Sequence, residues 1–462
     1  MRRSSGPWSS LFAVTNESSR GVIAALPLLA SLAIACGPSA ADIEPGRETG
    51  ACVEQACLGE LVCLSDVCVD PSVALTTGAD GGSATTDSGN PTADDSGDTV
   101  VPLTSVSILV VVDNSGTMGE EQARLPAAIT TLADALTNAG IAWRIGVTTS
   151  DNGNPWCDGT GPEGGQLVAS SCRSRTQDFV FAGAVPVDAT AEACLTPCPA
   201  EWANIGLAPS ADGVVHPWVE NVQGATNLPA GLSVGDALGC IVPQGISGCG
   251  FEEQLESMNK AITRTQTEGE ASLGFLPADA LLAVVMVTDE ADCSLNKAFE
   301  TIFLPDGNRV FWSNPRDGAP TSAVCWNAGV TCSGSACSSA DKNVDGGPAA
   351  DPDTDAVLRP VSRYVDALQA PAASMFALIG GVDASGNAVY SDSPSDPAFV
   401  VDFGIGPGCE GPGGRAVPPV RMREVAEAFA DGTQNTFSVC ETSYVAAMEA
   451  YATAIITRMQ SG

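Results

Sequence analysis

The chain has 462 residues, with 20 Lys plus Arg against 55 Asp plus Glu, and therefore a formal net charge of −35. This excess of negative charge repels phosphate backbones and anionic membrane surfaces, which disfavours nucleic-acid binding. Its one histidine, His216, makes multi-histidine zinc sites and a Ser-His catalytic pair poor candidates. Because His216 stands beside Pro217, we expect a surface or turn histidine.

The N-terminal 35 residues have the pattern of an export signal. Arg2, Arg3 and Arg20 precede an apolar run at 22–35 that ends in small residues directly before Cys36. This run is too short for an ordinary membrane span. Its exit resembles a bacterial lipobox, which implies cleavage before Cys36, lipidation of Cys36 and contact with the membrane through the lipid alone. A plain signal peptide or an uncleaved anchor is the alternative. We expect an outer-membrane or cell-surface lipoprotein of a bacterial envelope.

The cysteine content agrees with export. Of 17 cysteines, Cys36 would carry lipid, and the remaining 16 could form eight disulfides, as in an oxidising compartment. Cys52, Cys57, Cys63 and Cys68 form a cluster without a C-x2-C knuckle or a nearby histidine, so we expect two disulfides rather than zinc. Residues 36–75 are therefore predicted to be a lipidated N-terminus with a small Cys-rich module, and the other 12 cysteines follow in the globular domain.

A polar stretch separates this module from the rest of the chain. Residues 76–100 are dominated by Gly, Ser, Thr, Ala and Asp, and no Lys or Arg occurs between Arg47 and Arg124. With little to bury, the stretch is predicted to be a flexible acidic linker. Residues 101–462 contain no second linker of this kind, which favours one domain with insertions.

The first element of that domain ends in an oxygen-rich loop. The run 108–112 is continuously apolar, which predicts a strand buried on both faces, as in a parallel sheet. Asp113, Ser115 and Thr117 follow it, and an amphipathic helix at 125–136 comes next. Ligands of open α/β sheets bind at the carboxyl ends of strands, next to electropositive helix N-termini. The loop therefore predicts a site for a divalent cation with an anionic co-ligand.

Further elements follow in the same alternation. The expected strands and helices are a strand from Trp143, a helix through 251–262, a strand at 281–287, a helix beginning near Ala356, a strand at 374–380, an edge strand at 436–439 and a final helix through 444–455. Long stretches at 151–245, 295–353 and 380–419 show little periodicity. We interpret them as insertions, the first two braced by disulfides.

Two of these strand ends resemble the von Willebrand factor type A (VWA) domain. Asp113-x-Ser115-x-Thr117 is similar to the DxSx[ST] loop of its metal-ion-dependent adhesion site. Thr288-Asp289 is similar to the later Thr-Asp-Gly loop, with Glu290 where glycine is usual. The resemblance, to bacterial cell-surface VWA lipoproteins in particular, implies a Rossmann-like α/β fold with a mostly parallel sheet flanked by helices.

The resemblance also implies a set of metal ligands. Asp113, Ser115 and Thr117 would be primary ligands, and Asp289 would approach the ion, often through water. The family's middle ligand is a threonine before a central helix. Here Ser247 is the first candidate and Thr226 the second.

These oxygen donors suit Mg²⁺, which takes six oxygens at about 2.1 Å and retains waters. Ca²⁺ or Mn²⁺ could substitute for it. Adhesion-type VWA domains use the open metal position to accept a carboxylate from a partner. The resemblance therefore implies a non-enzymatic adhesion or protein-binding module, whose partner is an extracellular or envelope protein.

Two alternatives remain. A strand followed by Asp-x-Asp-Gly-Thr opens the haloacid-dehalogenase-like phosphatases, which would use Asp113, but Ser115 replaces the second aspartate and no general acid is evident. A metal-free envelope structural protein is the other alternative. Simple helix capping by Asp113 would explain one motif but not both.

Overall fold

The computed structural model describes residues 62–64, 67–69, 102–157, 160–183, 186–430 and 432–461. The expected export signal, Cys36 and the linker at 76–100 lie outside these residues. Within the expected Cys-rich module, the strands β1 (Val62–Leu64) and β2 (Val67–Val69) pair antiparallel. No helix in the described ranges combines the length and apolarity that a membrane span requires.

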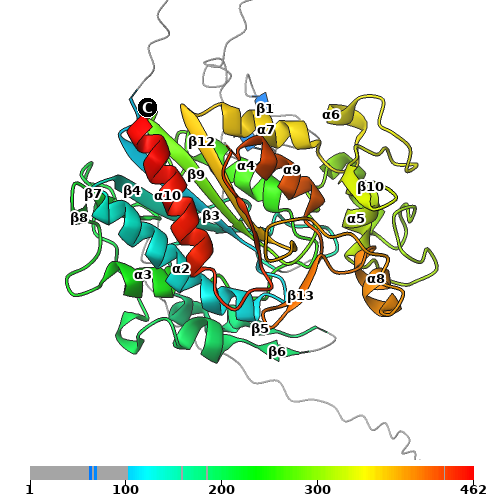
Figure 1. The fold of residues 1–462 in the computed structure, drawn as a ribbon, viewed down its shortest axis with the longest axis horizontal. Coiled ribbons are helices and arrows are strands. Elements are labelled where there is room, and N and C mark those ends of the chain that lie inside the picture. Colours follow the sequence, from blue (N-terminus) through cyan, green and yellow to red (C-terminus); the bar gives the residue numbers. More distant parts are fainter. Residues whose placement is uncertain are drawn as a thin grey trace, which may run out of the picture. The chain divides into compact units, whose positions relative to one another are not determined.

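A seven-stranded sheet forms the centre of the fold, in the order β15-β12-β9-β3-β4-β7-β8 (Figure 1). The parallel strands are β3 (Ser105–Val112), β4 (Ala142–Thr149), β9 (Ala280–Val287), β12 (Ala373–Gly380) and β15 (Thr436–Ser438). The edge strands β7 (Val219–Val222) and β8 (Ala225–Thr226) each run antiparallel to the preceding strand in this order. The expected α/β fold with a mostly parallel sheet is confirmed.

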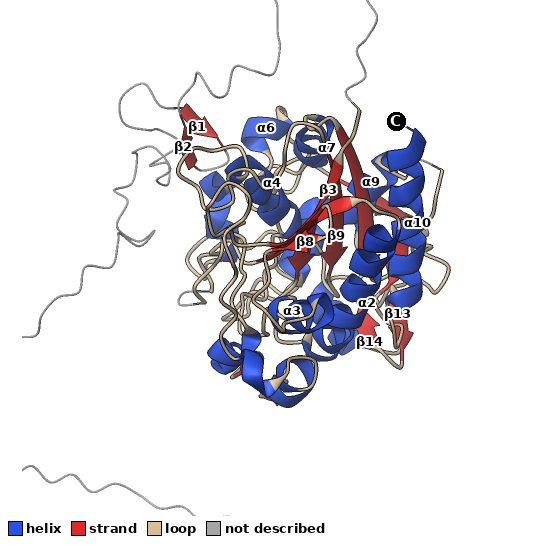
Figure 2. Ribbon diagram, turned by 90° about the vertical axis from the view of Figure 1, so that its left-hand side faces the viewer, coloured by secondary structure: helices blue, strands red, loops and turns tan. Residues whose placement is uncertain are grey.

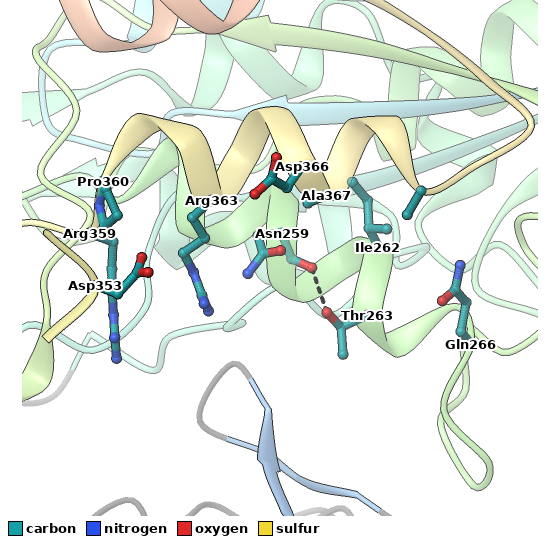
Figure 3. Close-up of a pocket in the computed structure, with 11 residues that line it drawn as sticks. Asn259, Ile262, Thr263, Gln266, Asp353, Arg359, Pro360, Arg363, Asp366 and Ala367 are labelled. Atoms are coloured by element: carbon teal, nitrogen blue, oxygen red, sulfur yellow. Dashed lines mark hydrogen bonds between the residues drawn. The ribbon is translucent and has the colours of Figure 1, made fainter. Parts of the chain in front are cut away.

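Helices cover both faces of this sheet. One face carries α2 (Gly119–Asn138), α3 (Val234–Ile241) and α10 (Val445–Ser461). The other carries α4 (Gln254–Arg264), α7 (Val361–Gln369) and α9 (Val420–Ala428). Figure 2 shows α4 on one side of the sheet and α2 and α10 on the other.

Burial on two faces explains the apolar runs. Along β3, Ile108 and Val110 pack into one core, while Leu109 and Val111 pack into the other. Every residue of β3 and of β9 is buried, so alternation of polar and apolar residues is absent. Helix α2 ends at Asn138, and Gly140 just after it adopts φ +74°, a conformation that favours glycine.

The connections from β3 and β9 diverge. After β3 the chain forms α2 on one face, and after β9 it reaches α7 on the other face. Since β3 and β9 are neighbours, their carboxyl ends lie at the point where the sheet order switches direction. Crevices at such points are where open α/β sheets bind ligands.

The insertions contain more regular structure than their sequences indicate. Their elements are η2 (Cys172–Phe179), β5 (Val180–Phe181), β6 (Val187–Asp188), η3 (Thr190–Leu195), η4 (Ala200–Trp202), η5 (Lys297–Phe303), α5 (Ala323–Gly329), β10 (Val330–Ser333), β11 (Ala336–Ser339), α6 (Pro352–Asp355), α8 (Pro397–Phe403), β13 (Cys409–Gly411) and β14 (Gly414–Ala416). The first insertion also supplies α3, β7 and β8, so it adds two strands to the central sheet.

Two further expectations need correction. The helix expected near Ala356 begins at Val361, and the Asp351 carboxylate instead caps the short α6 by accepting from the Asp353 N–H at 3.1 Å. His216 is 9% exposed rather than a surface residue. Its ring stacks on Trp218 with centroids 4.0 Å apart, and its Nε2 lies 2.7 Å from Asp212 Oδ2.

The prediction of disulfides in the globular domain is confirmed. All 12 of its cysteines are paired, as Cys157–Cys249, Cys172–Cys194, Cys198–Cys240, Cys293–Cys325, Cys332–Cys337 and Cys409–Cys440. The first of these joins the start of the first insertion to the segment before α4. Covalent links therefore brace the loops around the carboxyl ends of the central strands.

Candidate metal centre

The two motifs meet at adjacent strand ends. Val112 pairs with Val287 in the parallel register of β3 and β9, so Asp113 and Thr288 follow at the same edge of the sheet. The Thr288 hydroxyl donates to Asp113 Oδ2 at 2.5 Å, and the Asp113 N–H donates to the Val287 carbonyl at 3.0 Å. Segments 175 residues apart are thus hydrogen-bonded through their motif side chains.

The Asp113 carboxylate is completely buried and held in a fixed orientation. Its Oδ1 accepts from the Ser115 N–H at 2.8 Å, and its backbone carbonyl accepts from Gln122 Nε2 at 2.8 Å. Gln254 Nε2 donates to the Thr288 hydroxyl at 2.8 Å and so helps to orient the hydroxyl that donates to Asp113. Burial raises the pKa of Asp113, and the hydrogen bonds from Thr288 and Ser115 oppose that rise.

The two hydroxyls of the first motif lie together. Ser115 Oγ and Thr117 Oγ1 are 3.3 Å apart, with Ser115 buried and Thr117 exposed. Between them, a Cβ atom on Gly116 would lie 2.7 Å from the Phe181 ring, so glycine is required for this close approach. The loop therefore faces solvent through Thr117.

Asp289 completes the group. It is 6% exposed, and its Oδ1 has no hydrogen-bond partner among the described residues. Burial raises the pKa of Asp289 well above its usual value, the negative charge of Asp113 raises it further, and a hydrogen bond with the Thr117 side chain lowers it. The structure thus brings Asp113, Ser115, Thr117 and Asp289 to one end of β3 and β9.

The candidates for the middle ligand differ in position. The Gly248 N–H donates to the Asn114 carbonyl at 2.9 Å, which places the half-buried Ser247 beside the first loop. Within the described part of the chain, no hydrogen bond links the Ser247 hydroxyl to Asp113.

Thr226 lies at the opposite end of the sheet. It pairs with Asn221, which pairs with Trp143, which in turn pairs with Val106 near the start of β3. Thr226 is therefore excluded as a ligand shared with Asp113.

More carboxylates surround the site than the motifs predict. Burial raises the pKa of Glu290 to about 8, and the negative charge of Asp113 contributes to that rise. Burial also raises the pKa of Glu121 to about 7, although Arg124 opposes it. Glu252 is completely buried, and burial and then Asp113 raise its pKa well above the usual value. Glu252 was not predicted as a site residue, although the Glu252–Glu253 pair before the predicted helix was visible in the sequence.

The residues present fit a hard divalent cation. Across the described ranges, no group of three or more His, Cys, Asp or Glu side chains has the arrangement of a metal cluster. The donors here are instead a mixture of two hydroxyls with Asp113 and Asp289. Among the described residues Asp289 Oδ1 is buried without a hydrogen-bond partner, and the negative charge of Asp113 raises the pKa of Asp289, so a cation would satisfy the free oxygen and neutralise the charge.

No known protein family, curated protein or solved structure matches this chain. The interpretation of the site therefore depends on the chain's own residues and their geometry.

Proposed function

We propose that this protein is a metal-ion-dependent adhesion or protein-binding module, similar to VWA domains, on an exported bacterial lipoprotein. The observation that carries the proposal is the hydrogen bond from Thr288 to Asp113, which joins the two motifs, with Asp289 beside Thr117. A single motif that served only as a helix cap would not require the second. The position of both loops at the switch point of the sheet supports a Rossmann-like VWA fold.

The residues divide into ligands and supports. Asp113, Ser115 and Thr117 would hold the ion, and Asp289 would approach it through water, with Ser247 on the neighbouring segment. Gln122 holds the first loop in place by donating to the carbonyls of Asp113 and Gly245. When bound, the cation would supply an open position for a partner's carboxylate, with Mg²⁺ favoured and Ca²⁺ or Mn²⁺ as substitutes.

The setting of the module follows from the chain outside the site. Six disulfides are consistent with an oxidising envelope compartment. Lipidation of Cys36 would attach the protein to a membrane, and the linker at 76–100 would separate the module from its surface. The net charge of −35 favours a protein partner over nucleic acid.

The experiment is a cation titration of the purified protein by calorimetry and thermal unfolding. We expect Mg²⁺, Mn²⁺ or Ca²⁺ to release or absorb heat and to raise the Tm, and Asp113→Ala to abolish both effects. Asp134→Ala, which changes an exposed aspartate on α2, is the matched control and should behave as wild type.

Two results would overturn the proposal. No heat with any of the three cations would favour the metal-free structural protein. Metal-dependent phosphatase turnover that is lost in Asp113→Asn would favour the hydrolase, in spite of Ser115 at the position of the general acid.

A further inference from the structure

The segment before α4 crosses the carboxyl ends of the central strands. The Glu253 N–H donates to the Ser150 carbonyl after β4 at 3.0 Å, and the Glu252 carbonyl accepts from the Cys293 N–H after β9 at 2.7 Å. Because β3 lies between β4 and β9, these bonds place Glu252 across the end of β3. Asp113 is the residue at that end.

A second contact places the same segment at the site. Gln254, two residues after Glu252, donates through Nε2 to the Thr288 hydroxyl that itself donates to Asp113. A further link is the hydrogen bond from the Ser150 N–H to the Val112 carbonyl at 3.2 Å. Ser150 therefore contacts β3 itself, and Gln254 contacts the Thr288 hydroxyl at the end of β9 that donates to Asp113.

The Glu252 side chain is only half satisfied. It is 0% exposed, and its Oε2 accepts a hydrogen bond from the Ser150 hydroxyl. Its Oε1 has no hydrogen-bond partner within the described ranges. Burial raises the pKa of Glu252, and the charges that raise it further are those of Asp113, Asp151 and Glu290. A buried carboxylate oxygen without a partner, on a group whose pKa other carboxylates raise, lacks the compensation such groups require.

The adjacent Glu253 provides a contrast. It is also buried, and burial raises its pKa to about 8. However, Lys260 and Lys297 lower that pKa, so the protein itself supplies positive charge to Glu253. For Glu252, hydrogen bonding from Ser150 is the one lowering influence among its main causes, and the groups around it are negative.

We infer that Glu252 is a metal-ligating residue of the Asp113 site, and that its Oε1 supplies the oxygen of the middle segment. This inference rests on the proposed cation-binding function. The middle segment would then contribute a carboxylate instead of, or in addition to, the Ser247 hydroxyl. Asp113 and Glu252 would then be the two direct carboxylate ligands, with Asp289 approaching through water, and ligand charge is one of the main determinants of divalent-cation affinity.

The test is calorimetric titration of the full chain with MgCl₂ and with CaCl₂. Glu252→Gln keeps the shape of the side chain and an acceptor for Ser150, but it removes the negative charge. We expect it to weaken the Kd about tenfold or more. Glu253→Gln is the matched control, with the same change one residue away, and should stay within about twofold of wild type.

The outcomes separate the two proposals. If Glu252→Gln binds as wild type, or if both glutamine variants weaken binding equally, the inference is overturned while the Asp113 site stands. If Asp113→Ala retains the wild-type Kd, the Asp113 site itself is wrong, and an absence of binding in wild type overturns both.

Folding of the variants is checked by circular dichroism. Should Glu252→Gln fail to fold, Ser150→Ala leaves the carboxylate in place and removes the group that orients it. We expect a loss of affinity of about tenfold or more for that variant, because removing the hydrogen-bonded support of a metal ligand typically costs about 10- to 100-fold in affinity. An unchanged Kd in Ser150→Ala would then overturn the inference.

Discussion

Two groups of buried carboxylates lie close together in this protein. They differ in the sign of the charges that surround them. Asp292 and Glu256 are paired with guanidinium groups, since Asp292 Oδ2 lies 2.9 Å from Arg421 Nε and Glu256 Oε1 lies 3.1 Å from Arg363 Nη2. Asp113 and Asp289 are also buried, but the charges that act on Asp289 are those of other carboxylates, Asp113 among them. We interpret the first group as structural and the second as the part of the fold reserved for a cation.

The pKa values of Glu256 and Asp289 illustrate the difference. Burial raises the pKa of Glu256, but Arg363 and other positive groups outweigh it, and the net shift is downward. For Asp289, burial and its carboxylate neighbours act in the same direction. The same desolvation therefore leaves one carboxylate charged and stable, and the other in need of an external counter-ion.

The largest expected effect tests the structural group. Arg421→Ala leaves Asp292 completely buried without its partner, and breaking such a pair costs about 3–5 kcal/mol of unfolding free energy. Urea denaturation measures this loss. Arg415→Ala breaks the exposed Arg415–Asp396 pair and should cost far less, because solvent screens a pair at the surface. Equal losses in the two variants would show that burial of the pair does not matter.

The next effect concerns the pH dependence of stability and Glu253, whose pKa is about 8 when folded against an ordinary value of 4.5. The folded state then binds a proton more tightly than the unfolded state. Stability is full below about pH 4.5 and is lost as pH rises towards 8, by at most about 1.4 kcal/mol per unit. Glu253→Gln should flatten the stability profile over this range, as followed by urea unfolding at each pH in the presence of EDTA. If the variant shows the same slope of unfolding free energy against pH as wild type, the raised pKa of Glu253 is contradicted.

The smallest effect concerns the cation site without its ion. Asp289→Asn removes one of two repelling buried carboxylates, so it should raise the unfolding free energy in EDTA by about 1 kcal/mol at pH 8. The same change should weaken Mg²⁺ binding, so the gain becomes a loss at saturating Mg²⁺. Urea unfolding with and without Mg²⁺ measures both. Destabilisation of similar size under both conditions would place Asp289 in the structural group.

The parts of the fold that could be predicted from sequence are those with local signals. The strands that become β3 and β9 are continuous apolar runs, and α2 and α10 repeat apolar residues at spacings of three and four. The polar residues that follow the β3 and β9 strands were visible too, because they directly follow the apolar runs in the sequence. Residues at a strand end share an edge of the sheet once the strands are parallel.

Other elements depend on distant partners. Strand β7 reads Val-Glu-Asn-Val, and its buried Glu220 is explained only by Trp218 Nε1 at 3.0 Å and by Arg144 of β4. Helix α9 was not predicted, because its buried Arg421 is explained only by its partner Asp292, which lies 129 residues away in the sequence. Glu252 was missed because sequence does not show which side chain of a charged pair faces a strand end.

The Cys157–Cys249 disulfide makes the geometry of the candidate metal site depend on cysteine oxidation. It holds the segment of Ser247 and Glu252 against the loop after β4, where the Cys249 N–H also donates to Asp151 Oδ2 at 3.1 Å. In a reducing cytosol this covalent closure is absent, and the hydrogen bonds alone position the segment. For the exported protein that we propose, formation of this disulfide would complete the candidate ion site during oxidative folding.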